Sequence, residues 1–307
     1  MASQAPALEG VRAGGARVGA YVALTKPRII ELLLVTTLPT MVVAQRGLPS
    51  LALIVATLAG GALAAGGANA INMVVDRDID QVMHRTRNRP LVTGAVTPRA
   101  ALVFALALEV VAFAELWVLV NPLSAILAVS ATAFYVFVYT LWLKRRSAQN
   151  IVIGGAAGAV PVLVGWAAVT DRLAWAPVVL FAVIFVWTPP HFWALAVRYR
   201  DDYRAAAVPM LPVVASLRRT TGEIVLYTAV LVAVSLLFAP VGHMGALYVA
   251  VAAVTGLVYL VMAGRLWGRA RRDQATSRDA MRLFGYSITY LTVLFLAMAV
   301  DVLVGFH

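Results

Sequence analysis

The feature that most limits the fold is a succession of long apolar runs. About nine segments have the length of about 17 to 25 residues that an α-helix needs to cross a hydrocarbon layer about 30 Å thick. They cover residues 29–46, 51–74, 99–120, 123–143, 150–170, 174–197, 220–240, 243–264 and 283–304. The chain is 62% hydrophobic and 13% charged, against about 25% charged in ordinary soluble domains. The sequence therefore predicts an all-α integral membrane protein.

The segment ahead of the first run, residues 1–28, is polar and rich in Ala and Gly, with several arginines and a single acid. It lacks the short apolar core and small-residue cleavage site of a secretory signal. We expect a retained cytoplasmic tail, disordered to about Tyr21, with a short organelle-targeting segment as the alternative. Residues 29–307 are then one transmembrane domain. The chain has no cysteine, which excludes disulfides and iron–sulfur clusters.

The net charge of +11 is distributed on one side of the predicted spans. All 25 Lys and Arg except Arg46 and Arg172 fall in the tail and in alternate connections. By the positive-inside rule this set is cytoplasmic, so we expect the N-terminus inside and the C-terminus outside. A bacterial cytoplasmic (inner) membrane is the expected location, with the mitochondrial inner membrane as the alternative. Anionic membrane lipid accounts for the excess charge, and no nucleic-acid partner is needed.

The same connections alternate in character, which suggests an internal repeat. Those after the second and sixth spans mix aspartates with arginines, whereas those after the fourth and eighth are purely basic. This pattern suggests two similar four-helix halves, residues 29–143 and 150–264, followed by an extra helix at 283–304.

The end of the second run carries the first acidic cluster. Asn72, Asp76 and Asp80 are spaced i, i+4 and i+8, which places them on one stripe of a helix, successive members separated by about 6 Å along the axis. Carboxylates one turn apart suit Mg²⁺, which keeps waters while it bridges carboxylates to a substrate phosphate. Arg85 and Arg89 follow closely, and guanidinium groups bind oxyanions. The cluster therefore predicts a binding site for a diphosphate. The alternative interpretation is a helix end whose acids are exposed to water.

A second acidic cluster follows the sixth run. Asp201 and Asp202 are adjacent, so on a helix they diverge by about 100° and cannot both face one ion. We expect that one binds the ion while the other pairs with Arg198 or Arg204. Prolines a few residues further on predict extended or turn structure, as expected of a loop that caps a cavity.

At these residues the chain resembles the UbiA intramembrane prenyltransferase superfamily, and within it most closely the branch that prenylates haem. The resemblance covers about residues 20 to 300. It rests on LTKPR (24–28), NMVVDRDIDQVMHRTRNRPL (72–91), YTLWLKRRSAQNIVIGGAAGAVPVLVGWAA (139–168), WTPPHFWALAVRYRDDY (187–203) and PMLPVV (209–214). It implies a bundle of nine transmembrane helices around a central cavity. The implied reaction transfers the farnesyl group of farnesyl diphosphate to a vinyl group of haem b, giving haem O and diphosphate.

The resemblance also implies roles for particular residues. The match to the first metal and diphosphate motif makes Asn72, Asp76 and Asp80 catalytic Mg²⁺ ligands, and Asp202 best matches the second motif. That motif often has two acids four residues apart, whereas Arg198 occupies the first of these positions in this chain. Haem b enters as a substrate, not a resident cofactor. A haem A synthase or terminal oxidase assembly is an implied partner.

Several further residues are candidates for substrate binding. Departure of a diphosphate is stabilised by cations, and a prenyl cation by aromatic faces, for which Tyr139 is suited. His191 is predicted to begin a helix after two prolines. It lies in an apolar run where ionisable groups are costly, so it either faces haem, handles a proton or makes a buried structural hydrogen bond. Glu109 and Glu115 either face the cavity or hydrogen-bond a neighbouring helix in protonated form. The substrate-binding candidates are Arg28, Arg85, Arg89, Tyr139, Lys144, Arg145, His191, Arg198 and Asp201.

Two other functions remain open at this point. A prenyltransferase for a quinone precursor or another aromatic acceptor would share the metal and diphosphate chemistry and differ only in the acceptor pocket. A cation-coupled transporter would also contain intramembrane acids and repeated halves. The transporter predicts acids near the middle of spans, whereas Asp76, Asp80 and Asp202 lie at their ends, next to arginines.

Overall fold

The computed structural model describes residues 17–305, with the side chains of residues 28, 29 and 31–34 excluded, and these residues form helices and connecting turns without a strand. Eight helices are long and apolar enough to cross a membrane: α3 (Leu51–Val75), α5 (Pro98–Leu119), α6 continued by η1 (Pro122–Leu143), α7 (Asn150–Thr170), α8 (Trp175–Arg198), α11 (Leu217–Val241), α12 (Ala246–Ala270) and α13 (Ser277–Val304). A further long helix, α2 (Pro27–Gln45), coincides with the first predicted run. The all-helical membrane fold is therefore confirmed.

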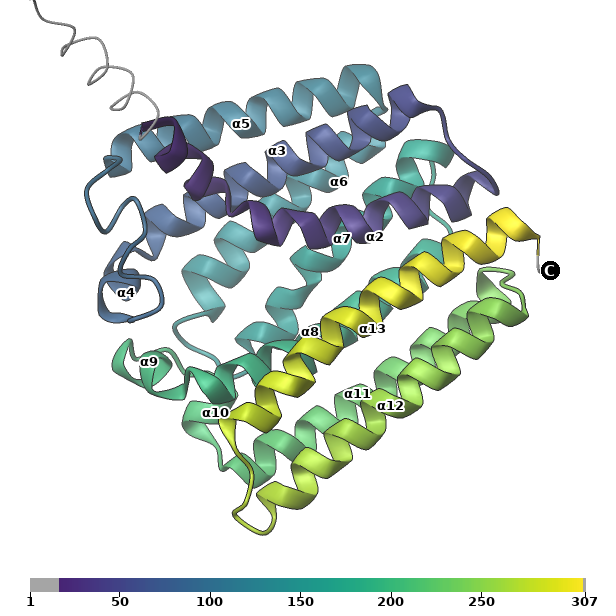
Figure 1. Ribbon diagram of the computed structural model, residues 1–307. Helices are drawn as coiled ribbons and strands as arrows, with labels where there is room; N and C mark the ends of the chain where they lie inside the picture. The colour runs from purple at the N-terminus through teal and green to yellow at the C-terminus, as the bar shows by residue number, and fades with distance from the viewer. Residues whose placement is uncertain (1–16, 306–307) are drawn as a thin grey trace, which may run out of the picture.

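The long helices lie side by side and form one bundle (Figure 1). Helices α3 and α5 pack together at one edge, α11 and α12 pack together at the other, and α2, α7, α8 and α13 connect the two edges. Three short helices lie at one end of the bundle: α4 (Arg77–Val82), α9 (Arg200–Ala205) and α10 (Leu211–Val214). Apolar side chains from all three share one buried cluster, so the two predicted acidic regions lie at the same end of the molecule.

Local sequence signals account for most helix starts. Proline occupies the first turn of α5 and α6, where its missing N–H costs nothing. The side chains of Thr97 and Asn121 accept hydrogen bonds from the first turns of these helices. Helix α13 begins with a capping box formed by Thr276 and Asp279. Such caps satisfy backbone N–H groups that have no partner within the helix.

Close packing of α3 against α5 depends on small residues of α3. A Cβ on Gly60 would lie 2.1 Å from Glu115 Oε2, and one on Gly67 would lie 2.6 Å from Glu109 Oε1. Small residues let membrane helices approach closely. Glu109 Oε1 also accepts a hydrogen bond of 3.2 Å from Thr132 of α6. Glu109 is therefore a contact between helices within the membrane, one of the two possibilities open for it from the sequence.

The tail is more ordered than predicted. Residues 17–25 are helical, so the prediction of disorder to about Tyr21 is wrong from residue 17 onward. Leu24 is fully buried, and the ring of Tyr21 packs edge-on against Phe104 of α5, with 5.1 Å between ring centroids. This contact between segments far apart in sequence orders the helix. Residues 1–16 lie outside the described part of the chain.

Two predictions from proline were also wrong. Pro189 and Pro190 lie inside α8, so His191 does not begin a helix. Pro212 belongs to the first turn of the short helix α10, where extended or turn structure was expected, whereas Pro209 lies outside the helices, as expected. A chain in a membrane keeps its helical backbone where it can, because open peptide groups find no water there.

Candidate active site

The predicted acidic stripe of Asn72, Asp76 and Asp80 is present, although α3 ends just before Asp76. The Asp76 N–H donates to the Asn72 carbonyl at 2.9 Å, and the Asp80 N–H donates to the Asp76 carbonyl at 2.9 Å. The helical hydrogen-bond pattern thus continues through the junction of α3 and α4 and keeps the three residues one turn apart. All three side chains are buried.

Among the described residues, hydrogen bonds reach only one carboxylate oxygen of Asp76. Asn72 Nδ2 donates to Asp76 Oδ2 at 2.7 Å, and Lys144 Nζ donates to the same oxygen. Asp76 Oδ1 is buried and has no hydrogen-bond partner among the described residues; Arg145 Nη2 lies 3.8 Å from it, beyond hydrogen-bond distance. A buried carboxylate oxygen without a partner is costly, and so it indicates a place for a ligand.

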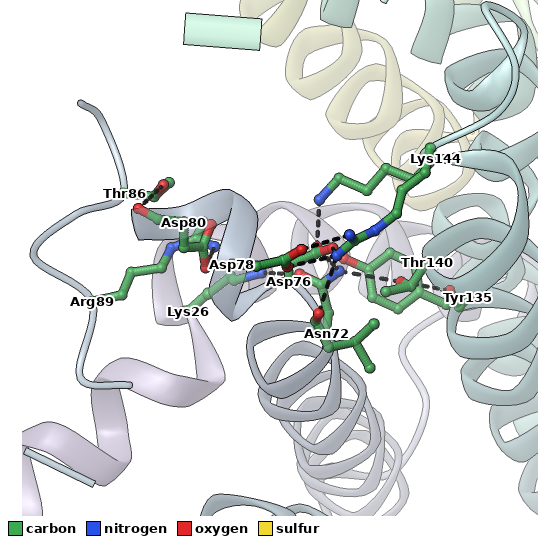
Figure 2. A network of polar contacts seen from close by, with 12 residues as sticks. Lys26, Asn72, Asp76, Asp78, Asp80, Thr86, Arg89, Tyr135, Thr140 and Lys144 are labelled. Carbon is green, nitrogen blue, oxygen red and sulfur yellow. Dashed lines mark hydrogen bonds and ion pairs between the residues drawn. The ribbon is translucent and has the colours of Figure 1, made fainter. Parts of the chain in front are cut away.

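Lys26 is a member of this cluster that sequence reasoning missed. Its Nζ donates to Asn72 Oδ1 at 2.9 Å, as Figure 2 shows. The pKa of Lys26 is lowered to about 7, chiefly by burial and next by the charges of Arg89 and Lys144. Three cations therefore converge on the stripe. In the sequence Lys26 counted only as one charge of the tail; the signal was its place immediately before Pro27, at the start of a span.

Asp80 is neutralised by the loop that follows α4. Arg89 Nη1 lies 2.6 Å from Asp80 Oδ2, and the Thr86 hydroxyl donates to the Asp80 carbonyl at 3.2 Å. The loop therefore turns back over α4 and brings a guanidinium group to the second carboxylate. The predicted proximity of Arg89 to the acids is present in the structure.

A π-helical segment, η1 (Phe134–Leu143), carries the opposite wall of the site. The Thr140 hydroxyl donates to the Tyr135 carbonyl five residues earlier at 2.9 Å, and the Lys144 N–H donates to the Tyr139 carbonyl at 2.9 Å. At about 100° per residue in an α-helix, Thr140 would be rotated by about 140° from Tyr135. The wider π-helical turn instead directs Tyr135, Thr140 and Lys144 toward the stripe (Figure 2). Such segments are frequent at functional sites.

Arg145 contacts a different acid from its neighbour Lys144. Its two terminal nitrogens lie 2.7 Å from the two oxygens of Asp78, and Nη2 also donates to the Val75 carbonyl at 3.2 Å. The hydrogen bonds from Arg145 hold the pKa of Asp78 near 2, well below its usual range. Arg145 therefore ties η1 to the junction of α3 and α4.

The two acids of the second cluster diverge as predicted. Asp201 pairs with Arg204 at 2.8 Å and its side chain is 93% exposed. Asp202 is half-buried and its Oδ2 accepts a hydrogen bond of 3.2 Å from the Arg85 N–H. The Arg85 guanidinium lies over the ring of Tyr199, 5.5 Å from its centroid. Asp202 and Arg85 thus join the two acidic regions.

Two of the predicted substrate-binding residues are exposed and lie outside the buried cluster. Asp201 points to Arg204, as described above. Arg198 is exposed at the end of α8. The side chain of Arg28 lies outside the described residues.

The residues present fit Mg²⁺ held by few protein ligands. Within residues 17–305 no three Asp, Glu or His side chains converge as a complete metal site. Mg²⁺ commonly uses only one or two carboxylates, with waters and substrate phosphates as the other ligands. Asp76 and Asp80 supply such carboxylates, and Asp76 Oδ1 is the buried acceptor without a partner. Asn72 Oδ1 is already bonded to Lys26, so in this arrangement Asn72 orients Asp76.

Tyr139 lies in a space that only a glycine leaves open. Its ring stacks on Tyr135 with 5.4 Å between centroids, and a Cβ on Gly154 of α7 would lie 2.3 Å from Tyr139 Cδ2. Real Cβ atoms do not approach this closely, so a side chain at position 154 moves the ring.

We therefore expect Gly154→Ala to lower turnover about tenfold or more, since displacement of a residue that lines a reaction site misaligns the substrate. Gly158→Ala, on the same helix with open space around its Cβ, is the matched control and should retain full turnover. Steady-state kinetics with a prenyl diphosphate would measure both. Equal activity of the two variants would show that the position of Tyr139 does not matter.

His191 is part of an aromatic and polar cluster between α8 and α13. Its Nδ1 lies 2.7 Å from Ser287 Oγ, and its ring stacks between Trp187 and Phe284, with centroids 4.2 Å and 4.5 Å away. The Trp187 indole N–H donates to the Ser287 carbonyl at 2.8 Å. The buried hydrogen bond that the sequence left as one alternative is therefore present, and a role of His191 toward haem stays a prediction.

The fold and the site together define a class of protein. A bundle of membrane-spanning helices with buried carboxylates, lysines and an arginine gathered at one end is suited to an enzyme that handles an anionic substrate from within the membrane. The profile of the UbiA prenyltransferase family matches residues 33–300. The chain belongs to this family, which confirms the resemblance inferred from its motifs.

Two curated relatives cover nearly the whole chain. Protoheme IX farnesyltransferase from Renibacterium salmoninarum is 57% identical over 290 residues, which are 94% of this chain and 91% of the relative. Protoheme IX farnesyltransferase from Streptomyces avermitilis is 54% identical over 293 residues, which are 95% of this chain and 96% of the relative.

Two solved structures share the fold. A UbiA homolog from Archaeoglobus fulgidus bound to GPP and Mg²⁺ has a TM-score of 0.64 at 18% identity, over 91% of this chain and 99% of that one. A digeranylgeranylglyceryl phosphate synthase structure has a TM-score of 0.76 at 15% identity, over 93% of this chain and 98% of that one.

Proposed function

We propose that the protein transfers the farnesyl group of farnesyl diphosphate to a vinyl group of haem b, giving haem O and diphosphate. The observation that carries the reaction class is the buried pair Asp76 and Asp80 with Lys26, Lys144 and Arg89 around it. The names of the relatives at 54–57% identity support haem as the acceptor.

The chemistry begins at the leaving group. Ionisation of the allylic C–O bond develops negative charge on the bridging oxygen of the diphosphate, and preorganised cations stabilise this charge. Lys144, Arg89 and Lys26 are held around Asp76, Asp80 and Asn72 before substrate arrives. Asp76 and Asp80 would hold Mg²⁺, with Asp202 as a ligand from the second cluster; the bound ion supplies Lewis-acid neutralisation of the diphosphate.

The second step is formation of the carbon–carbon bond. The allylic cation is attacked by the haem vinyl group, and water then adds to the resulting porphyrin-stabilised cation with loss of one proton, which gives the hydroxyethylfarnesyl group. The stacked rings of Tyr135 and Tyr139 beside the stripe offer aromatic faces to a cation. Apolar surroundings keep other water from the cation before attack.

We place the end with the acidic stripe in the cytoplasm. The basic connections predicted to be cytoplasmic lie at this end, together with α4, α9 and α10 (Figure 1). Arg46 lies at the other end, where it donates to the carbonyls of Gly242 and His243 at 2.6 and 3.2 Å. The bacterial relatives support a cell membrane location. Transfer of the product to a haem A synthase or a terminal oxidase assembly remains an implication of the resemblance.

We expect His191→Ala to reduce transfer to haem b about tenfold or more, without change in the affinity for farnesyl diphosphate, because His191 is an intramembrane ionisable residue that contacts Ser287 and aromatic rings. Steady-state kinetics with varied haem and a direct binding measurement with farnesyl diphosphate would separate the two effects. Equal loss of both would assign His191 to structure alone, through its bond to Ser287.

The decisive experiment is mass spectrometry of haems extracted after the purified protein is incubated with haem b and farnesyl diphosphate, with and without Mg²⁺. A Mg²⁺-dependent hydroxyethylfarnesyl haem supports both donor and acceptor. Unchanged haem, with farnesyl diphosphate consumed on addition of a quinone precursor, would favour the aromatic-acceptor alternative. No reaction with either acceptor in a folded protein would contradict the proposal and favour the transporter.

A further inference from the structure

A basic groove lies away from the acidic stripe, between the start of α11 and the end of α12. These two helices form an edge of the bundle (Figure 1). The groove has a volume of about 370 Å³, and its lining includes Ser216, Arg218, Arg219, Gly222, Glu223 and Trp267. None of these residues has a part in the proposed prenyl transfer.

The upper rim of the groove, by which we mean the part formed by the first turn of α11, is suited to an anion. Arg218 and Arg219 are exposed, and among the described residues neither forms an ion pair, whereas Arg269 nearby is paired with Asp279. Both arginines lie in the first turn of α11, whose backbone N–H groups attract negative charge. Two unpaired guanidinium groups beside a helix start favour a phosphate.

The lower part of the groove changes from polar to apolar. Trp267 Nε1 would lie 3.4 Å from a Cβ on Gly222, so the absent side chain at Gly222 lets the indole lie against α11. The guanidinium of Arg271 covers the ring of Trp267 at 5.2 Å. Leu226, which is 57% exposed, lines the groove on the side of the membrane. Tryptophan and arginine side chains are typical of the boundary between lipid headgroups and acyl chains.

We propose that this groove binds the headgroup of an anionic membrane phospholipid. Its phosphate contacts Arg218 and Arg219, and its acyl chain lies along Leu226. Glu223 also lines the groove; it accepts a hydrogen bond from a headgroup hydroxyl, so the site favours a glycerol headgroup. A free phosphate has the chemistry of the upper rim but no group for the apolar edge.

A bound lipid would also support the acidic site. Ser216, in the lining of the groove, accepts a hydrogen bond of 3.2 Å from the Arg219 N–H and caps α11. Only residue 215 separates this cap from α10, which packs against α9, where Asp202 lies. The lipid therefore fixes one end of the segment that carries the second acidic cluster.

The test is native mass spectrometry of the whole protein in detergent with phosphatidylglycerol or phosphatidylcholine of the same acyl chains. We expect the unaltered protein to retain phosphatidylglycerol preferentially. The variant Arg218→Gln/Arg219→Gln should bind it about thirtyfold more weakly, since each basic residue near a lipid surface contributes about 1 kcal/mol and a factor of ten in affinity corresponds to about 1.4 kcal/mol. The variant Arg272→Gln/Arg278→Gln removes the same charge from exposed positions outside the groove and should bind as the unaltered protein does.

Two results would overturn the proposal. Equal loss of phosphatidylglycerol in both double variants would show attraction by net charge and no groove. Displacement of the lipid by inorganic phosphate at equal concentration would assign the groove to a free anion. Thermal unfolding of each variant in detergent checks its fold, and the single substitutions Arg218→Gln and Arg219→Gln, each expected to weaken binding several-fold, replace the double variant if it does not fold. Prenyl transfer in detergent without lipid should be the same in both double variants, which keeps this test separate from the proposed reaction.

Discussion

Asp76→Asn is expected to lower turnover of farnesyl diphosphate by about a thousandfold or more, in the range seen when preorganised stabilisation of a charged transition state is removed. The carboxylate is fully buried and one of its oxygens has no partner, so it is the strongest candidate for the metal. Asparagine has nearly the same shape but no charge. Product formation at saturating Mg²⁺ would measure the loss, and size-exclusion chromatography in detergent would show that the variant still inserts and folds.

Asp78→Asn is the matched control for this variant, two residues further along the chain in the first turn of α4. Asp78 is 65% exposed and pairs with Arg145, so its loss should change turnover by no more than about threefold, as for an exposed pair. Asp80→Asn should resemble Asp76→Asn. Near-normal activity in Asp76→Asn or Asp80→Asn would remove the basis for a metal at the stripe.

The acidic stripe could be predicted because its geometry is local. Asn72, Asp76 and Asp80 depend only on helical periodicity, which the backbone keeps even where α3 ends. The divergence of Asp201 from Asp202 follows from the same rule. These predictions needed no knowledge of which helices are neighbours.

The remaining members of the site depend on tertiary contacts that a single sequence does not contain. Lys26 reaches Asn72 across 46 residues, and Thr140 and Lys144 are brought to the stripe by π-helical hydrogen bonding. The sequence of an apolar run such as 123–143 does not show whether its backbone N–H groups bond to the carbonyl four residues earlier, as in an α-helix, or five residues earlier, as in a π-helix. Sequence reasoning therefore placed Lys144 among the anion-binding candidates without predicting its partner Asp76.

The nine apolar runs gave the helices to within a few residues, since the thickness of a membrane sets their length. Predictions of helix ends from proline failed inside the membrane, where the backbone stays helical because its polar groups find no water. The prolines at 189 and 190 are helix breakers in water, but α8 continues through them.

Lys144→Met is expected to affect both stability and catalysis. Lys144 is the cation bonded to Asp76, and its removal leaves a buried carboxylate with the Asn72 amide and with Arg145 at 3.8 Å. Breaking a buried ion pair on one side costs about 3 to 5 kcal/mol. Turnover should fall about a hundredfold or more, because the leaving diphosphate loses one of its cations. Thermal unfolding in detergent and product formation would measure the two effects.

The double variant Lys144→Met/Asp76→Asn separates these two roles. It leaves no uncompensated charge, so its unfolding temperature should return close to that of the unaltered protein, since removing both members of a buried pair is often neutral. Its turnover should stay at the level of Asp76→Asn, because neither the carboxylate nor the ammonium is restored. A double variant as unstable as Lys144→Met would show that the lysine stabilises the protein through other contacts. Full turnover in Lys144→Met would show that the diphosphate departs without it, and Lys26 and Arg89 would then be the cations that stabilise its charge.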